Sequence, residues 1–349
     1  MASDMPVALV IGASRGIGRQ IAVDLARNNY AVVVAAKSTS NAHAPNTPFP
    51  PDPNSPQSTV STVQREICEA GGEATAIPVD VRDAASVEQL VDQTIAKYSR
   101  LDVLIYNPGA IWWASVQDTP TKRFQLMQRV NVEGLYAAVQ ASLPHLLPRS
   151  QRDHNQQGIE NSKKDSNSTR RAGRIIVVSP PIYSRFFRGK TAYAMGKVAM
   201  SVLTIGLGMD FERQGLVKGD DGCAVTSIWP AVAIQSAATS QFTSRDPSQL
   251  LDLRKPTIFS DAILAILGAP ASLVNGRTLI DEDFLRSRGL VRDFDGYSVV
   301  PRRASGREKE GKAAQPPRRI MPLEFPDLTV REQDDEGSRI DSSKAMAKL

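Results

Sequence analysis

The chain has 349 residues, 41% of them hydrophobic, so it can form one large α/β domain with extensions or two small domains. The net charge of +5 is modest and its basic residues are scattered or lie in polar inserts, which argues against a nucleic-acid-binding protein. We find no run of 18 apolar residues and expect no membrane span. Because Cys68 and Cys223 match neither a disulfide framework nor a zinc site, we also expect no metal.

The first predicted strand is Val7–Ile11, a continuous aliphatic run typical of a strand buried on both faces of a parallel sheet. Gly12, Gly16 and Gly18 follow, and apolar residues from Ile17 onward recur at helical spacing. A glycine-rich turn between a buried strand and a helix brings backbone N–H groups and the positive end of the helix dipole against a phosphate. We therefore predict a dinucleotide-binding loop; the alternative is a simple tight turn.

Further strands are predicted at 31–36, 74–79, 102–106, 174–178, 224–229 and 277–280. Between them, helical periodicity runs through 60–67, 87–95, 121–147 and 192–213. Alternation of this kind specifies parallel strands with right-handed crossovers. The predicted fold class is therefore α/β, a single Rossmann-like doubly wound parallel sheet of about seven strands with helices on both faces.

Composition divides the chain into one domain and a tail. Residues 1–302 form the predicted domain, which carries two polar inserts at about 38–58 and 149–171. These inserts are rich in Pro, Asn, Ser or charge and low in apolar residues, so we expect them to be disordered. Residues 303–349 are charged and proline-bearing, and we expect a largely disordered C-terminal tail.

Tyr193 and Lys197 form a Y-x-x-x-K pair on the predicted helix 192–213. Residues four apart share one face of a helix, so the ammonium can lie near the phenol. A free tyrosine titrates near about 10, and a neighbouring ammonium together with an oxidised nicotinamide lowers that pKa. The tyrosine can then exchange a proton with a carbonyl or alcohol near neutral pH. The alternative is a half-exposed tyrosine beside a solvated lysine.

On these residues the chain resembles the short-chain dehydrogenase/reductase family over roughly residues 6–300. The motifs of that family are matched in order by Gly12–Gly18, Asp80, the turn at Asn107, Asn131 and the pair of Tyr193 and Lys197. Within the family the chain looks most like the hydroxysteroid dehydrogenase-like protein 2 branch, on residues 35–37, 118–123, 131–134, 179–181, 229–230 and 280–283. Relatives in that branch often carry a C-terminal sterol-carrier domain, whose pattern we do not find after residue 303, so we do not transfer lipid carriage.

The resemblance implies roles for individual residues. Asp80 would contact the adenine and Asn107 would lie along the cofactor ribose. Asn131 would hold a water in a proton relay to Lys197, which would also bond the nicotinamide ribose; alternatively, Asn131 kinks its helix and bonds only backbone. The pyrophosphate and adenosine phosphate would be held by Gly12, Ser14, Arg15, Gly16, Ile17 and Gly18.

The chain departs from the family pattern at three places. Ile11 replaces the usual threonine before the first glycine, so a local hydrogen bond is lost. Tyr106 and Pro108 alter the usual Asn-Asn-Ala-Gly turn. The catalytic serine usually lies 13 residues before the tyrosine, where this chain has Pro180. Ser179 can fill the role if the loop gains one residue and is otherwise a strand-end serine that bonds backbone; Ser184 is the second candidate. Without such a serine, polarisation of the substrate oxygen weakens.

The basic residues Arg15 and Lys37 favour NADP as cofactor. An NAD-preferring site usually has an acidic residue near the end of the second strand to bond the ribose 2′-hydroxyl, and the sequence has none between residues 31 and 42. Two cations suit a 2′-phosphate instead. The alternative is that both are solvent-exposed charges.

The predicted function is hydride transfer between nicotinamide and a carbonyl or secondary alcohol. The residues Trp112, Trp113, Phe186 and Phe187 suggest an apolar, lipid-like substrate, although such residues are often simple packing. The alternative is a nucleotide-binding regulatory protein with little turnover. The family resemblance also suggests a homo-oligomer.

The sequence ends in Ala347-Lys348-Leu349, which follows the small–basic–leucine pattern of a peroxisomal address. We therefore expect recognition by a peroxisomal import receptor and a peroxisomal location. The first predicted strand begins at Val7, so we expect no signal peptide. The alternative is a chance tripeptide on a cytoplasmic protein.

Overall fold

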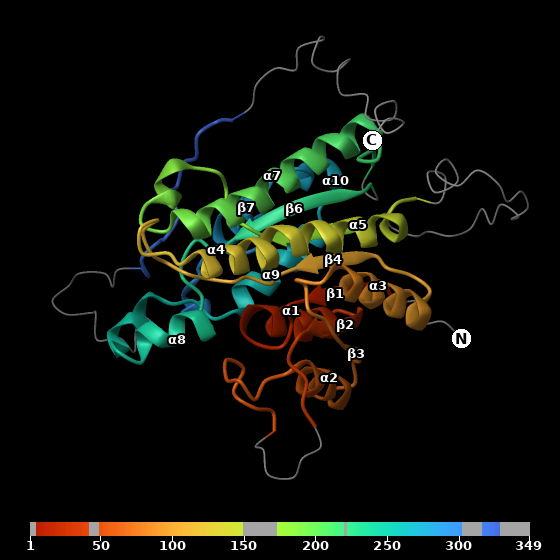
Figure 1. The fold of residues 1–349 in the computed structure, drawn as a ribbon, viewed down its shortest axis with the longest axis horizontal. Coiled ribbons are helices and arrows are strands. Elements are labelled where there is room, and N and C mark those ends of the chain that lie inside the picture. Colours follow the sequence, from red (N-terminus) through yellow and green to blue (C-terminus); the bar gives the residue numbers. More distant parts are fainter. Residues whose placement is uncertain (1–4, 42–48, 149–172, 220–221, 302–315, 329–349) are drawn as a thin grey trace, which may run out of the picture.

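The computed structural model describes residues 5–41, 49–148, 173–219, 222–301 and 316–328. One parallel sheet of seven strands has the order β3-β2-β1-β4-β5-β6-β7 (Figure 1). Its strands are β1 (Val7–Ile11), β2 (Ala31–Ala36), β3 (Glu73–Pro78), β4 (Val103–Tyr106), β5 (Arg174–Val178), β6 (Ala224–Trp229) and β7 (Thr278–Ile280). The predicted doubly wound sheet is confirmed; four strands have the predicted ends and three differ by one residue.

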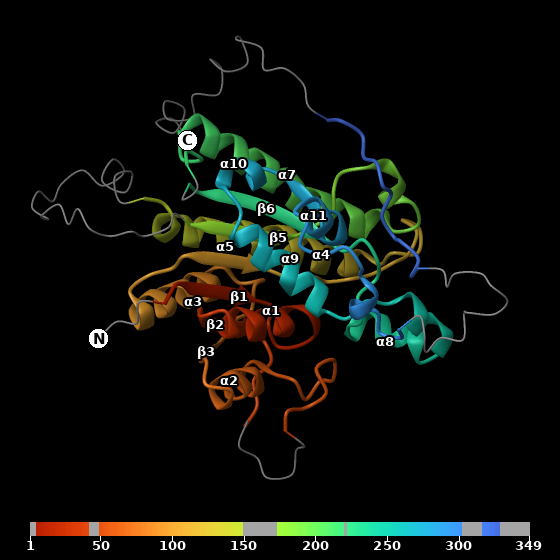
Figure 2. The same ribbon diagram turned by 180° about the vertical axis from the view of Figure 1, so that it is seen from behind.

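Helices cover both faces of the sheet (Figures 1 and 2). Successive strand residues point to opposite faces, so Ala8 and Val10 enter one core and Leu9 and Ile11 the other. The first core is closed by α1 (Gly16–Arg27), α2 (Val60–Glu69) and α9 (Thr257–Leu267). The second is closed by α3 (Ala84–Tyr98), α5 (Gly134–Leu146) and α7 (Thr191–Arg213).

The remaining helical elements are short. The predicted helix 121–147 is found as α4, a π-helical turn and α5 in succession. The sequence did not predict the four helices α8 to α11, of which α9 belongs to the first core. The short elements are α4 (Thr121–Gln128), the π-helix Arg129–Glu133, α8 (Ala237–Thr243), α10 (Ala271–Val274), α11 (Asp281–Ser287) and 3₁₀ turns at Ser184–Phe187, Pro247–Asp252 and Asp295–Tyr297.

The strand order reverses between β1 and β4, which are neighbours although two strands separate them in sequence. In an open α/β sheet, ligands bind in the crevice outside the carboxyl ends of the strands at such a switch point. Ile11 at the end of β1 pairs with Tyr106 at the end of β4, so the glycine loop and the turn at Asn107 leave the sheet side by side.

Helix α7 is long and apolar enough to span a membrane by length and composition, the one such helix among the described residues. Half of its most apolar window is buried inside the protein. The helix packs on β6, α4 and the π-helical turn, as the core helix of an α/β domain does.

Parts of the two segments for which the sequence predicts disorder, residues 49–58 and 316–328, pack against the domain. In residues 49–58, Pro51 and Ser58 are buried. In residues 316–328, Met321 is buried and the amide of Ile320 donates to the carbonyl of Ala231 at 2.8 Å. Local composition misses these contacts because their partners lie far away in sequence. The insert at 149–171 and the chain end at 329–349 lie outside the described residues.

Candidate active site

The glycine loop has the close packing that a phosphate-binding turn needs. Gly12 and Gly16 have φ values of +81° and +55°, which L side chains rarely adopt. A Cβ on Gly18 would lie 2.2 Å from the carbonyl oxygen of Gly12, so no other residue fits there. That same oxygen accepts a hydrogen bond of 3.0 Å from Nδ2 of Asn107. The loop and the Asn107 turn are therefore fixed to each other.

The other residues predicted for the phosphates lie in the same loop. Ser14 is buried, Arg15 is the N-cap of α1, and Ile17 is the second residue of the helix. The first amides of a helix have no acceptor within it, and the helix dipole favours an anion there. The chain's residues thus fit a dinucleotide pyrophosphate at this position.

Lys37 and Asp80 come together at the carboxyl ends of β2 and β3. Nζ of Lys37 lies 3.3 Å from a carboxylate oxygen of Asp80, although the lysine side chain is 70% exposed. Arg82, which the sequence reasoning missed, donates Nε to the other oxygen of Asp80 at 2.8 Å. The Arg82 guanidinium, helped by Lys37, holds the pKa of Asp80 well below its usual range. The carboxylate is therefore neutralised by two cations.

Tyr193 and Lys197 lie on successive turns of α7, and both are only 3% exposed. Nζ of Lys197 donates to the carbonyl of Val178 at 2.8 Å, and burial lowers the pKa of this lysine to about 7. Burial raises the pKa of the Tyr193 phenol above its ordinary value. The sequence argument expected a lowered value; desolvation acts in the opposite direction and dominates in this structure.

Asn131 lies in the π-helical turn and is fully buried. Its Oδ1 accepts from the amide of Ala110 at 2.9 Å, and its Nδ2 donates to the carbonyl of Ala110 at 3.3 Å. These bonds agree with the backbone-bonding alternative. A Cβ placed on Gly109 would lie 3.5 Å from Nζ of Lys197 and 4.0 Å from Oδ1 of Asn131. The structure therefore brings Asn131 and Lys197 to the same point of the loop after β4.

The π-helical turn is held by Tyr106, the residue that departs from the family's turn motif. The amide of Gly134 bonds to the carbonyl of Arg129, five residues earlier, which leaves the carbonyl of Val130 for another donor. The Tyr106 phenol donates to that carbonyl. A Cβ on Gly134 would lie 2.5 Å from the Tyr106 hydroxyl oxygen, so the phenol occupies the space that the glycine leaves.

The side chain of Ser179 contacts Ser201. The hydroxyl of Ser201 donates to Oγ of Ser179 at 3.0 Å and also lies 2.6 Å from the carbonyl of Pro180. Ser201 is eight residues, or about 12 Å along the axis, beyond Tyr193 on α7. The contact with Ser201 agrees with the alternative in which Ser179 is a structural serine at the strand end. Ser184, the second candidate, is exposed in a 3₁₀ turn.

A model of the short chain dehydrogenase family matches residues 6–48 and 54–232. The chain belongs to this family. The hydroxysteroid dehydrogenase-like protein 2 of Danio rerio is 33% identical over 294 residues, which are 84% of this chain and 60% of that protein. The chain thus spans between 48% and 60% of the length of such curated relatives.

Two solved structures are similar to this dehydrogenase over most of its length. A Xanthomonas campestris protein assigned as a dehydrogenase is 32% identical and has a TM-score of 0.67. The match covers 86% of this chain and 95% of that chain. A short chain dehydrogenase from Mycobacterium thermoresistibile is 30% identical with a TM-score of 0.66; 85% of this chain and 91% of that chain are covered. The predicted family, branch and fold are confirmed.

Aromatic side chains cover the Tyr193 ring in this dehydrogenase. Phe186 lies 6.2 Å from it and Trp113 meets it edge-on at 6.3 Å, measured between ring centroids. Trp113 in turn stacks on Phe242 of α8 at 5.6 Å. The indole nitrogen of Trp229, whose ring lies 5.5 Å from Nζ of Lys197, is buried without a hydrogen-bond partner among the described residues. Tyr193 and Lys197 therefore face an apolar surface that contains one unpaired indole N–H.

Residues 316–328, which we call the C-terminal strap, extend this aromatic surface. The hydroxyl of Tyr183 lies 3.3 Å from the sulfur of Met321, and its ring meets Phe325 edge-on at 5.5 Å. Tyr183 also contacts Phe186 at 5.9 Å. The strap is fastened by Arg319, whose guanidinium makes two bonds of 2.9 and 2.6 Å to the carboxylate of Asp283.

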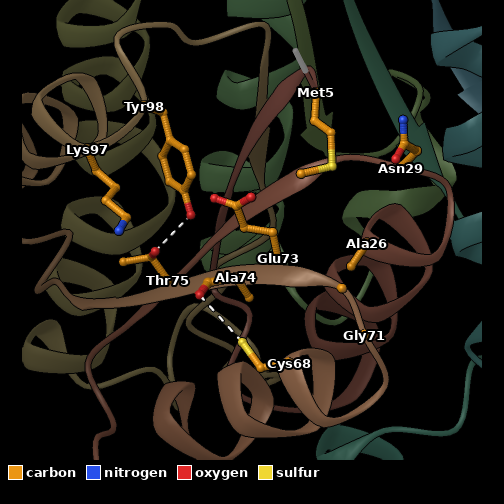
Figure 3. Close-up of a pocket in the computed structure, with 11 residues that line it drawn as sticks. Met5, Ala26, Asn29, Cys68, Gly71, Glu73, Ala74, Thr75, Lys97 and Tyr98 are labelled. Carbon is orange, nitrogen blue, oxygen red and sulfur yellow. Dashed lines mark hydrogen bonds between the residues drawn. The ribbon is translucent and has the colours of Figure 1, made fainter. Parts of the chain in front are cut away.

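A separate cavity of about 460 Å³ lies at the amino end of β3 (Figure 3). Its lining includes Glu73, the first residue of that strand, and Tyr98, whose hydroxyl bonds to Oγ1 of Thr75 at 2.8 Å. The strands are parallel, so this cavity is at the opposite end of the sheet from the glycine loop. Within the part of the chain that the structure describes, no group of three or more His, Cys, Asp or Glu is placed to hold a metal ion.

Proposed function

We propose that this dehydrogenase transfers a hydride between NADP(H) and a carbonyl or secondary alcohol of an apolar, lipid-like substrate. The observation that carries the proposal is the buried pair of Tyr193 and Lys197 under aromatic side chains, at the end of the sheet where the glycine loop lies. A titratable pair beside a dinucleotide loop and an apolar surface suits carbonyl reduction.

When bound, the nicotinamide supplies or accepts the hydride. Tyr193 gives its phenolic proton to the substrate oxygen in reduction; burial favours the protonated phenol, so the proton is available near neutral pH. Lys197 is fixed by the carbonyl of Val178, and burial lowers its pKa to about 7, so it can return a proton toward the tyrosine. Asn131 holds the loop at Ala110 and so fixes the wall beside Lys197.

The NADP preference rests on the cations around the carboxyl ends of β1 to β3. Arg15, Lys37 and Arg82 supply three positive charges, while Asp80 at the end of β3 is already paired with two of them. A 2′-phosphate suits that balance better than a bare 2′-hydroxyl.

The apolar substrate is supported by Trp113, Phe186, Phe242 and Tyr183 with its strap contacts, which together make the surroundings of Tyr193 aromatic. A substrate whose carbonyl approaches Tyr193 would have aromatic rings along much of its own length. Binding sites for small molecules are typically apolar with a few polar groups that fix orientation.

A second function is favoured by the position of Ser179. The hydroxyl of Ser179 contacts Ser201, so the end of β5 offers no serine donor to the substrate oxygen beside Tyr193. Polarisation of the substrate carbonyl is then weaker. A nucleotide-binding regulatory protein with little turnover fits that arrangement.

The two functions are separated by measuring NADPH oxidation with a panel of apolar aldehydes and ketones while NADPH binding is measured by fluorescence. The enzyme proposal expects turnover that Tyr193→Phe removes. Tight binding of NADPH without turnover on any carbonyl would favour the regulatory protein. Equal or tighter binding of NADH would contradict the NADP preference.

We also propose peroxisomal import through Ala347-Lys348-Leu349, which lies outside the described residues. Such an address is read by a receptor and leaves the fold untouched. An N-terminally tagged protein should localise to peroxisomes, and deletion of the tripeptide should move it to the cytosol without loss of activity. A diffuse signal from the intact tagged protein in cells with working peroxisomes would refute the proposal.

A further inference from the structure

The segment of residues 49–58, which we call the proline segment, docks on the glycine loop. The amide of Gly16, the first residue of α1, donates to the carbonyl of Pro53 at 2.8 Å. The hydroxyl of Ser58, which is fully buried, donates to the carbonyl of Ser14 at 2.6 Å. The segment therefore binds the backbone of the same turn that holds the dinucleotide phosphates.

The proline segment has its own internal supports. The guanidinium of Arg65 on α2 lies 3.8 Å from the centre of the Phe49 ring. The amide of Asn54 donates to a carboxylate oxygen of Asp52 at 2.7 Å. Residues 49–53 lie between the two stretches that the family model matches, and Asn54 begins the second stretch.

The side chain of Asn54 lies where the proline segment, the start of α1 and the start of α8 meet. Its Oδ1 is buried and has no hydrogen-bond partner among the described residues. The position that a Cβ would take on Gly16 lies 3.5 Å from this oxygen and 3.6 Å from Cβ of Ser236, at the start of α8. A buried polar atom left unpaired is costly, so the site calls for a ligand with hydrogen-bonding groups.

The helix end shows which ligand fits. Pro53 occupies the first free amide of α1, and the amides of Ile17 and Gly18 are the next donors that an anion meets. A side-chain amide can turn by 180° and present its N–H groups at the place of its oxygen. We propose that the proline segment is part of the cofactor site and that Asn54 donates a hydrogen bond to the dinucleotide pyrophosphate. The segment thus forms the wall of the phosphate site opposite α8.

The test measures binding of NADPH and NADH to the full-length chain by nicotinamide fluorescence. Asn54→Ala removes the donor, and Asn54→Asp places a negative charge against the phosphates. Gln57→Glu, an exposed position three residues away, is the matched control for added charge on the same segment. Thermal melting of each variant checks that the fold is kept.

We expect Asn54→Ala to raise the dissociation constants of NADPH and NADH by about 10-fold, the effect of losing one hydrogen bond to a charged group. Asn54→Asp should raise them further, and Gln57→Glu should change the dissociation constants less than twofold. Ser58→Ala, which loosens the segment without touching the cofactor, should speed NADPH release in stopped-flow measurements.

Competition with ADP and with 2′,5′-ADP locates the contact. ADP carries the pyrophosphate, so Asn54→Ala should weaken its binding as strongly as that of NADPH. 2′,5′-ADP carries no pyrophosphate, so its binding should be weakened less. Binding to Asn54→Asp as tight as to Gln57→Glu would overturn the inference. Failure of the wild-type chain to bind either nicotinamide nucleotide would instead overturn the dinucleotide site itself.

Discussion

Replacing Tyr106 with phenylalanine tests whether one phenol holds the π-helical turn that carries Asn131. The ring stays and fills the same volume, so the perturbation is the loss of a single hydrogen bond to the carbonyl of Val130. Tyr106 is fully buried, and burial raises the pKa of its phenol. The amide of Gly134 is already bonded to Arg129, so it does not replace the lost donor.

The magnitude follows from leaving a backbone acceptor without its partner. Such a loss costs about 1–3 kcal/mol when water cannot replace the donor. Tyr98→Phe is the matched control: its hydroxyl bonds to Thr75 at the wall of the cavity in Figure 3, where water can take its place. We expect the control to cost about 0.5–1.5 kcal/mol, the net value of an ordinary hydrogen bond.

Urea denaturation followed by circular dichroism gives the free energy of unfolding of both variants against the wild type. We expect Tyr106→Phe to be the more destabilising of the two and to lower kcat/KM for NADPH-dependent carbonyl reduction, because Asn131 and the Ala110 loop lose their support. If Tyr106→Phe unfolds at the same urea concentration as the wild type, or Tyr98→Phe costs more, the phenol does not hold the turn.

Three further outcomes are expected. Tyr193→Phe should lower kcat by about 10²- to 10⁴-fold, the usual contribution of a general acid, with NADPH affinity in a fluorescence titration nearly unchanged; retained turnover would exclude this mechanism. Burial lowers the pKa of Lys197 from 10.5 to about 7, so the unfolded chain binds more protons between these values and wild-type stability rises with pH across that window. Lys197→Met should therefore be inactive yet more stable than the wild type near pH 7, by about 1 kcal/mol or more in the free energy of unfolding. In parallel urea titrations this gain should shrink toward pH 10.5, and a gain that does not change with pH would contradict the lowered pKa. Ser179→Ala should leave kcat within about threefold of the wild type, well below the 10²-fold or larger loss that a missing oxyanion donor causes, and a larger loss in steady-state assays would restore Ser179 as the polarising serine.

The sheet could be predicted from the sequence because each central strand is a short run of buried β-branched and aliphatic residues. Val7–Ile11 and Arg174–Val178 are buried along their whole length, and such runs have few other places in a fold. Residues 316–328 could not be predicted in this way. Their apolar residues are few and lie among prolines and charges, and only distant partners such as Tyr183 and Ala231 give them a fixed position.

The candidate site was predictable where spacing along one element decides it. Tyr193 and Lys197 share a helix face by their separation of four residues, and the structure places both in the core. The direction of Ser179 could not be predicted, because it depends on Ser201 in another element. Arg82 and Asn54 were missed for the same reason, since their importance comes from Asp80 and from the helix end at Gly16.

The C-terminal strap has a consequence for the order in which the protein is made. The glycine loop and Asn107, which bond to each other, are both made early, but Tyr183 meets Met321 only after 138 residues beyond Tyr183 have been synthesised. We expect a nascent or truncated chain that stops at residue 302 to have its sheet and the buried pair of Tyr193 and Lys197, with the aromatic surface around Tyr183 still open to water. Domain boundaries drawn from the sheet alone would therefore yield a nucleotide-binding protein whose choice of substrate differs from that of the whole chain.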